Sequence, residues 1–256
     1  MKLTWLGRAC FLLTTDDALR ILFDPYLELY RECASADFPL PDMICVSHGH
    51  LDHFADVPEL VRGESPALVV AVPPLCRALR ELVPETQHRL YPLPWDDDVD
   101  IESVHFFAFK SPPMETSLYS MFAEFGAARV LEFLQAARQL ADDILYLPLT
   151  SFGVEVGGKR ILHFISEDEA PQNGVDVAQI GVRFHPDVVL LSVQHGDEVK
   201  SAQYAADLGA PLVIPHHYRP YQAVPGADMA LFESALARLA PACTLKRVEA
   251  LQPFTI

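Results

Sequence analysis

Strand-like and helix-like segments alternate along this chain, and they follow the same order in both halves. Apolar runs typical of β-strands lie at Leu3–Leu13, Arg20–Phe23, Met43–Ser47, Ala67–Val72, Val104–Phe109, Val154–Val156, Arg160–Ile165, Val188–Val193 and Leu212–Pro215. Helix-like segments lie at Val57–Val61, Leu75–Leu82, Arg129–Ala141, Ala202–Leu208 and Met229–Leu239. The pair Gly157–Gly158 separates two short apolar runs and predicts a hairpin turn. This order predicts an α/β fold, a sandwich of sheets with helices on both outer faces.

The length and composition are compatible with one large α/β domain. The chain has 256 residues, of which 50% are hydrophobic and 21% are charged, so we expect a large buried core. The apolar, mainly helical segment 112–148 interrupts the run of strands. We interpret it as a helical insert in a single domain that spans residues 1–256. A packed helix is the favoured role for this insert, and a lid or a partner-binding element is the alternative.

The charge balance limits the partners that this chain can have. It contains 19 basic and 35 acidic residues, a formal net charge of -16, which argues against binding a nucleic acid polymer or an anionic membrane. No segment reaches the roughly 18 uncharged apolar residues of a membrane span. The five cysteines are scattered, without CxxC pairs, as in a cytoplasmic protein with reduced thiols. We therefore expect a cytoplasmic protein with a small-molecule substrate, and a homo-oligomer is compatible with the sequence.

The stretch Ser47–Phe54, SHGHLDHF, contains four residues of the kinds that bind metals, within six positions: His48, His50, Asp52 and His53. It follows an apolar strand directly, and the carboxyl ends of strands are where α/β folds place their sites. His48 and His50 can direct their imidazoles at one ion, while Asp52 and His53 turn toward a second. Imidazole with an oxygen ligand suits zinc, manganese or iron. The stretch therefore predicts a site for one or two divalent ions, with zinc favoured.

The motif at His48–His53 is the HxHxDH signature, and it resembles that of the metallo-β-lactamase fold. The stretches Leu3–Leu13 and Ile21–Leu27 resemble the opening of its lactonase-like branch, the group that contains ascorbate-6-phosphate lactonase. The stretches Asp187–Val193 and Leu212–Tyr218 resemble the last two strand motifs of that branch. The resemblance covers most of the chain except the insert. It implies a four-layer αβ/βα sandwich with a metal site at one edge, and usually hydrolysis.

The resemblance also implies roles for individual residues. His48 and His50 match the histidines of the first metal, and Asp52 and His53 match the pair of the second. In many relatives the residue at Asp52 also transfers a proton, so Asp52 is the candidate catalytic residue. His217, in the sequence PHHY, matches the final histidine of the family.

Two further residues are candidates for substrate contact. Side chains alternate along an extended segment, so only one of His216 and His217 is expected to face the metals. His216 is then a hydrogen-bonded neighbour or surface histidine beside the site, or a substrate contact. Arg8 stands where relatives often have a histidine after glycine, and it could hold a substrate anion or pair with an acidic residue.

Two positions depart from the family pattern. The third histidine of the first metal is expected just after the strand at Val104–Phe109, where this chain has Ser111. His105 lies at the opposite end of that strand, so we predict a structural role for it. The bridging aspartate is expected in a Gly-Asp pair, where this chain reads Ser166-Glu167-Asp168. Glu167 and Asp168 are equally supported as metal ligands, and Ser166 is the third alternative.

The expected function is a metal-dependent hydrolase of a small ester, lactone or phosphodiester that uses a metal-activated water, with Asp52 as proton shuttle. One alternative is a member of the fold that binds a metal or another ligand without hydrolysis. The other is a non-hydrolytic metalloenzyme, an oxidase or lyase of a biosynthetic pathway. Diiron oxidoreductases of this fold normally carry glutamate where His50 stands, which weighs against that variety.

Overall fold

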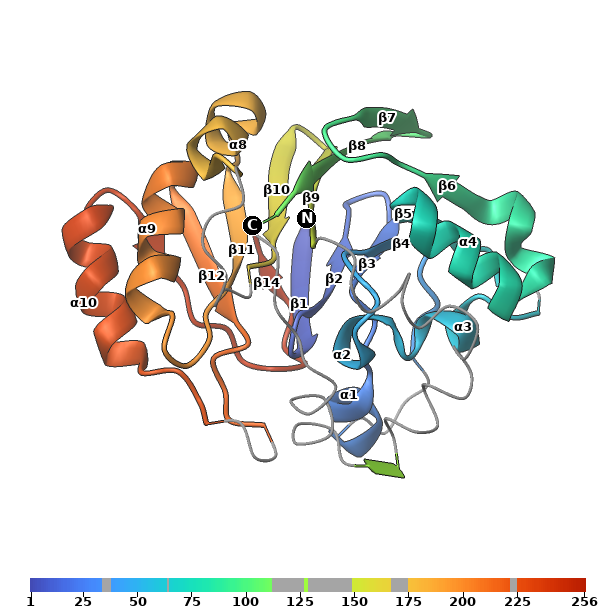
Figure 1. Cartoon of the computed structure of the whole chain (residues 1–256), viewed down its shortest axis with the longest axis horizontal. Helices are drawn as coiled ribbons and strands as arrows, with labels where there is room; N and C mark the ends of the chain where they lie inside the picture. Colours follow the sequence, from blue (N-terminus) through green and yellow to red (C-terminus); the bar gives the residue numbers. More distant parts are fainter. Residues whose placement is uncertain (34–37, 64, 112–126, 129–148, 167–174, 222–224) are drawn as a thin grey trace. The chain divides into compact units, whose positions relative to one another are not determined.

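The described part of the chain forms two compact units, each built on one seven-stranded sheet (Figure 1). The computed structural model describes residues 1–33, 38–63, 65–111, 127–128, 149–166, 175–221 and 225–256. Within these residues, the first unit holds 1–94, 127–128 and 248–256, and the second holds those of 95–111 and 149–247. The helix predicted at Arg129–Ala141 and nearly all of the predicted insert lie outside the described residues.

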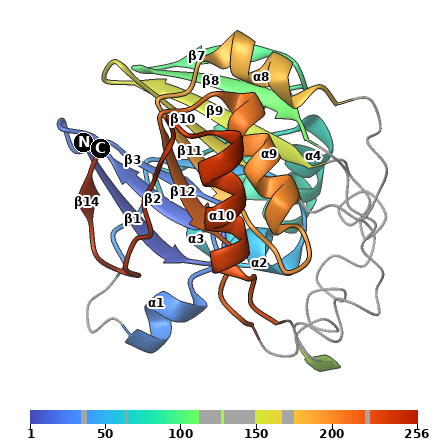
Figure 2. The same ribbon diagram turned by 90° about the vertical axis from the view of Figure 1, so that its left-hand side faces the viewer.

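The first unit has the strand order β14-β1-β2-β3-β4-β5-β6. Its strands are β1 (Lys2–Gly7), β2 (Cys10–Thr14), β3 (Arg20–Phe23), β4 (Met43–Val46), β5 (Leu68–Ala71), β6 (Leu90–Pro92) and β14 (Phe254–Thr255). The pairs from β14 to β3 are antiparallel and those from β3 to β6 are parallel. Its helices are α1 (Glu28–Cys33), α2 (Leu51–Phe54), α3 (Val57–Leu60), α4 (Pro73–Leu82) and the 3₁₀ helix η1 (Pro84–Arg89). The two chain ends lie side by side here, where β14 pairs with β1 (Figure 2).

The predicted run Leu3–Leu13 is two antiparallel strands, so the prediction of one strand was wrong. Strand β1 turns back into β2 within two residues, and Gly7 pairs with Cys10 across the turn. Gly7 and Arg8 take positive φ values of 111° and 47°, which the chain needs for so tight a reversal. The apolar pattern continues through the turn, so only the sequence Gly7-Arg8 marks it. The turn places Arg8 at the end of the first hairpin.

The second unit has the strand order β13-β12-β11-β10-β9-β8-β7. Its strands are β7 (Asp98–Ile101), β8 (Val104–Lys110), β9 (Thr150–Val156), β10 (Lys159–Phe164), β11 (Val188–Ser192), β12 (Leu212–His216) and β13 (Thr244–Leu245). Strands β7 to β10 are antiparallel, and β10 to β13 are parallel. The hairpin predicted at Gly157–Gly158 is confirmed, because both glycines have positive φ and Val156 pairs with Lys159 across them.

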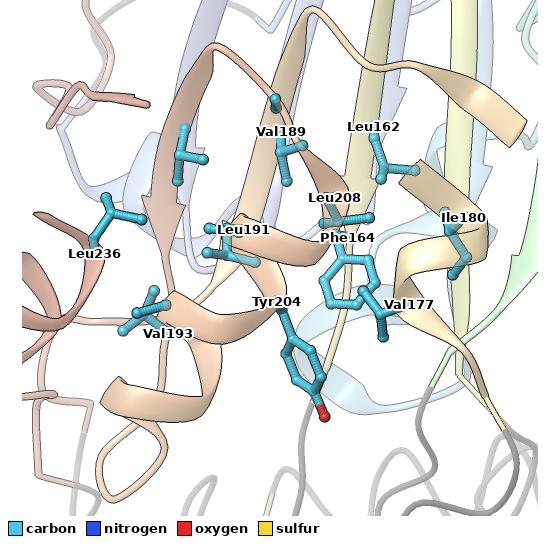
Figure 3. Packing of buried hydrophobic residues seen from close by; sticks show 14 of the residues in the cluster. Leu162, Phe164, Val177, Ile180, Val189, Leu191, Val193, Tyr204, Leu208 and Leu236 are labelled. Carbon is cyan, nitrogen blue, oxygen red and sulfur yellow. The ribbon is translucent and has the colours of Figure 1, made fainter. Parts of the chain in front are cut away.

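Three helices cover this second sheet (Figure 2): α8 (Val177–Phe184), α9 (Glu198–Leu208) and α10 (Met229–Leu239). Helix α8 buries Val177, Ile180 and Phe184 at helical spacing. Figure 3 shows side chains from β10 and β11 packed against those of the three helices, in a cluster whose members are all buried. Each fully buried valine, leucine, isoleucine or phenylalanine of this cluster contributes roughly 1.5–3 kcal/mol by burial. None of the helices in the described part of the chain combines the length and apolar character needed to cross a membrane.

Candidate metal centre

The predicted motif begins where β4 ends, in the first unit. All four residues of β4 are buried, and the chain then leaves the sheet at Ser47. Helix α2 begins after His50, whose extended backbone (ψ 154°) ends the loop, and this single turn carries Asp52 and His53. The motif's ionisable side chains are buried: His48 is 1% exposed, His50 6%, Asp52 3% and His53 0%. Burying so many polar groups is costly unless they bind one another or an ion. A solvated loop is therefore excluded.

His48 and His50 direct ring nitrogens at each other. Nε2 of His48 lies 2.9 Å from Nδ1 of His50, and the two rings meet edge to face. Two lone pairs at this separation repel, so the arrangement requires a proton or a metal ion. Two imidazole nitrogens on a tetrahedral zinc stand about 3.3 Å apart, given Zn–N bonds of about 2.0–2.1 Å. The observed separation is that of a hydrogen bond between the rings, somewhat shorter than two ligands of one zinc ion would show.

Asp24, at the carboxyl end of β3, contacts His53 directly and His48 through Ser47, and it is a candidate functional residue that the sequence did not reveal. Its Oδ1 accepts a hydrogen bond from the backbone N–H of Ser47 (2.7 Å), and its Oδ2 accepts one from the Ser47 hydroxyl (2.6 Å). The same Oδ2 lies 2.6 Å from Nδ1 of His53. Asp24 is fully buried. A signal existed in the sequence FDP, where an aspartate ends an apolar strand, but it resembles an ordinary turn.

This network fixes the tautomers of two histidines. A carboxylate only accepts hydrogen bonds, so Nδ1 of His53 carries the proton that Asp24 binds. The Ser47 hydroxyl donates to Asp24, so it accepts from Nδ1 of His48, 2.8 Å away. Each ring is then unprotonated at Nε2, the form that ligates metals. Hydrogen bonds of this kind orient metal-binding histidines in many proteins.

Asp24, His48 and His53 each offer a ligand atom, and these three atoms all lie within 4.8 Å of one another. Because the Asp24 carboxylate already accepts three hydrogen bonds, its geometry fits orientation of the histidines better than coordination. The donor set of imidazoles and carboxylates fits a divalent ion of the zinc, manganese or iron type.

Burial raises the pKa of the neighbouring Cys45 thiol well above its ordinary value, with a smaller effect from the charge of Asp24. This thiol therefore stays protonated.

Arg8 binds Asp52. Its Nη2 and Nε lie 2.6 and 3.0 Å from Oδ2 of Asp52, and this ion pair is largely buried. The same Oδ2 lies 3.6 Å from Nε2 of His53. Of the two roles considered for Arg8, the structure shows the pairing with an acidic residue.

The second unit holds a group of buried histidines, His163, His216 and His217. The rings of His163 and His216 stack with centroids 5.3 Å apart, and Nδ1 of His216 lies 2.8 Å from Nδ1 of His217. Strand β12 ends at His216, and His217 has a left-handed backbone with φ of 61°. We expected only one of these two histidines to face the metals, because side chains alternate along an extended segment. The backbone is not extended at His217, so this alternation does not apply there.

Hydroxyl groups stand at the two positions that depart from the family pattern. The Ser111 hydroxyl, after β8, hydrogen-bonds the Ser151 hydroxyl, which also accepts from the backbone N–H of Ile165 (3.0 Å). Ser166, after β10, is hydrogen-bonded to Tyr204, whose pKa is raised by burial. Glu167 and Asp168 lie outside the described residues.

His105 lies on the β7–β8 hairpin. Its two ring nitrogens lie 2.9 Å from Asp98 and 2.7 Å from Asp100. Both carboxylates belong to β7, the strand that pairs with β8. These cross-strand contacts are a structural role, as predicted.

Comparison with known proteins supports the predicted fold. Residues 2–92 match the family model described as the beta-lactamase superfamily domain. The structure resembles Igni18, a metallo hydrolase from Ignicoccus hospitalis, with a TM-score of 0.69 and 15% identity over 100% of this chain and 98% of that one. It also resembles the metallo-β-lactamase fold protein YhfI from Bacillus subtilis, with a TM-score of 0.63 and 10% identity over 99% and 98% of the two chains. These likenesses confirm the α/β fold of the metallo-β-lactamase type.

A sequence relative establishes the family. A UPF0173 metal-dependent hydrolase from Methanoregula boonei is 30% identical over 244 residues, which cover 93% of this chain and 90% of the relative. A relative of the same name from Methanosphaerula palustris is 28% identical over 93% of this chain and 92% of its own length. With the fold and the buried histidine–aspartate motif, these matches show that the chain belongs to the UPF0173 metal-dependent hydrolase family of the metallo-β-lactamase superfamily.

Proposed function

We propose that this protein is a metal-dependent hydrolase of a small ester, lactone or phosphodiester. The observation that carries the proposal is the pair of facing imidazole nitrogens of His48 and His50, 2.9 Å apart. It is supported by the hydrogen bonds through which Asp24 sets the tautomers of the neighbouring histidines. Hydrogen bonds that fix the tautomer and orientation of histidines are typical of metal sites, and an apolar core does not need them.

His48 and His50 would hold the first ion, and Asp52 and His53 are the proposed ligands of a second. His217, and Glu167 or Asp168, remain proposed ligands because of their positions in the sequence. Zinc is the favoured ion, with manganese or iron as alternatives. A bound ion would lower the pKa of a water molecule toward neutrality and polarise the carbonyl or phosphoryl group of the substrate.

The protein's own residues contribute position and proton transfer. Asp24 and Ser47 hold His48 and His53 in one orientation, so that no rearrangement is needed before the reaction. Arg8 holds Asp52 by two hydrogen bonds to a single oxygen. The Asp52 carboxylate is the proposed group that takes a proton and passes it to the leaving group. His216 remains a proposed substrate contact.

A second candidate is a family member that binds a metal or another ligand without hydrolysis. It is favoured by the hydroxyl of Ser111, which stands where the family pattern has a histidine, and by the hydroxyl of Ser166, the third alternative for the bridging aspartate after Glu167 and Asp168. Both hydroxyls bind other hydroxyl groups of the second unit, those of Ser151 and Tyr204. A centre with fewer ligands would hold its ion less tightly and activate water less well.

The test compares His50→Ala with His88→Ala, a substitution of an exposed histidine in the same unit. Both variants and the wild type are assayed for bound metal and for turnover of ester, lactone and phosphodiester panels. The proposal predicts that only His50→Ala loses metal and turnover, the latter by at least about a hundredfold. A wild type that holds metal but turns over nothing would support the second candidate. Equal turnover in His50→Ala and wild type would contradict the hydrolase proposal.

A further inference from the structure

Arg8 binds one oxygen of the carboxylate that a second metal ion would use. Both of its hydrogen bonds end on Oδ2 of Asp52, at 2.6 and 3.0 Å. This is the oxygen that lies 3.6 Å from Nε2 of His53. One oxygen therefore faces both the guanidinium group and the histidine with which Asp52 would share an ion.

The position of Arg8 is set by the fold. Arg8 lies in the tight turn between β1 and β2, with a left-handed backbone (φ 47°). The indole N–H of Trp5 donates a hydrogen bond to the carbonyl of Arg8 (2.9 Å), and Trp5 itself is buried. The Arg8 side chain is 13% exposed and that of Asp52 is 4% exposed. A side chain held in this way is a fixed part of the site.

The charge of Arg8 cannot be removed by a change of pH. A guanidinium group stays protonated under all conditions in which proteins fold, and its planar donors suit a carboxylate. A divalent ion on the same oxygen would lie beside this fixed positive charge, in a buried place where water screens little. The ion pair and the second metal ion therefore compete for Asp52.

We infer that Arg8 takes the place of one metal ion, so that this centre binds one divalent ion, on the side of His48 and His50, more tightly than it binds a second. A second ion at Asp52 and His53 binds only weakly. This inference rests on the proposed metal-dependent function, and it assigns the number of ions. Arg8 is a positioning residue in this account, because it acts through Asp52.

Zinc titration against a chromophoric chelator tests the inference on wild type, Arg8→Gln and Arg8→Lys. The matched control is Arg31→Gln, since Arg31 forms a similar pair with the buried Asp56 of the same unit (2.6 Å). We expect one tightly bound ion in the wild type, Arg8→Lys and the control. Arg8→Gln is expected to bind a second ion at least about tenfold more tightly than the wild type does. Circular dichroism checks that each variant is folded.

Several results would overturn the inference while leaving the proposed function intact. Two tight ions in the wild type would do so, even if no variant folds. The inference would also fail if folded Arg8→Gln bound the same number of ions as the wild type, with the same affinity for the second ion. It would fail as well if Arg8→Lys bound a second ion tightly. No bound ion in any of the four proteins would overturn the proposed function itself.

Discussion

The carboxyl ends of two parallel strands, β4 in the first unit and β10 in the second, have different chemistry. After β4 the chain carries buried charged and imidazole groups, which Asp24 and Arg8 hold in place. After β10 the described residues are Ile165 and Ser166, and the polar contacts there are hydroxyl to hydroxyl. Both sheets provide a strand end suited to a site. The end of β4 therefore carries the buried histidine–aspartate motif, whereas the described residues at the end of β10 form hydroxyl contacts.

The largest change in metal content that would alter this comparison is expected from substitutions in the second unit, at His216 and His217. We expect His217→Ala to lower metal content far more than His216→Ala does, because His217 matches the family's ligand. Loss of one ligand typically costs several kcal/mol, against about 10–16 kcal/mol for structural zinc binding. Elemental analysis of the two purified variants measures this. Equal losses would refute the assignment of His217.

An intermediate effect is expected from Asp24→Asn, which keeps the shape of the side chain. The amide that replaces one oxygen donates where Asp24 accepts, so the proton of His53 is driven from Nδ1 to Nε2. We expect metal affinity to fall by about 10–100-fold, the usual effect of removing such a partner. Chelator competition gives the affinity, and Asp42→Asn, at a half-exposed aspartate of the same unit, is the control. An unchanged metal affinity in folded Asp24→Asn would show that the hydrogen bonds of Asp24 do not orient the histidines for metal binding.

The smallest effect should come from the helices of the second unit. Asp228 caps α10, where its side chain accepts hydrogen bonds from the backbone N–H groups of Ala230 and Leu231, both at 3.1 Å. Asp228→Ala is expected to lower the free energy of unfolding by about 1 kcal/mol. Metal content should not change, because the Asp228 side chain binds the backbone of α10 and its loss leaves the proposed ligands in place. Urea denaturation and elemental analysis measure the two quantities, and a loss of metal in this variant would argue against a site centred on the first unit.

The sequence predicted the architecture well because the core strands are apolar and the hairpin glycines are distinctive. Apart from Leu3–Leu13, every predicted strand overlaps an observed one. The strands β6, β7, β13 and β14 were missed because each has four residues or fewer and no continuous buried run. Helix α8 was missed as well, although its apolar spacing is regular. Short exposed edge elements carry too little hydrophobic pattern to be recognised.

Local motifs in the site were predictable and long-range pairs were not. The ligand types from His48 to His53 lie within six positions, so their chemistry is visible in the sequence. Asp24 lies 23 residues from Ser47, and Arg8 lies 44 residues from Asp52, so nothing local marks either partnership. The sequence left the partner of Arg8 open, and it could not show that Asp24 sets the tautomers. Both depend on which strand ends the sheet brings together.

The central claim is that the buried histidine and aspartate residues after β4 bind a divalent ion. The most direct test is elemental analysis of full-length protein purified without added metal, before and after treatment with a chelator. We predict about one divalent ion per chain, lost to the chelator and regained on titration with zinc, manganese or iron. A folded protein that holds no metal and gains none on titration would contradict the claim.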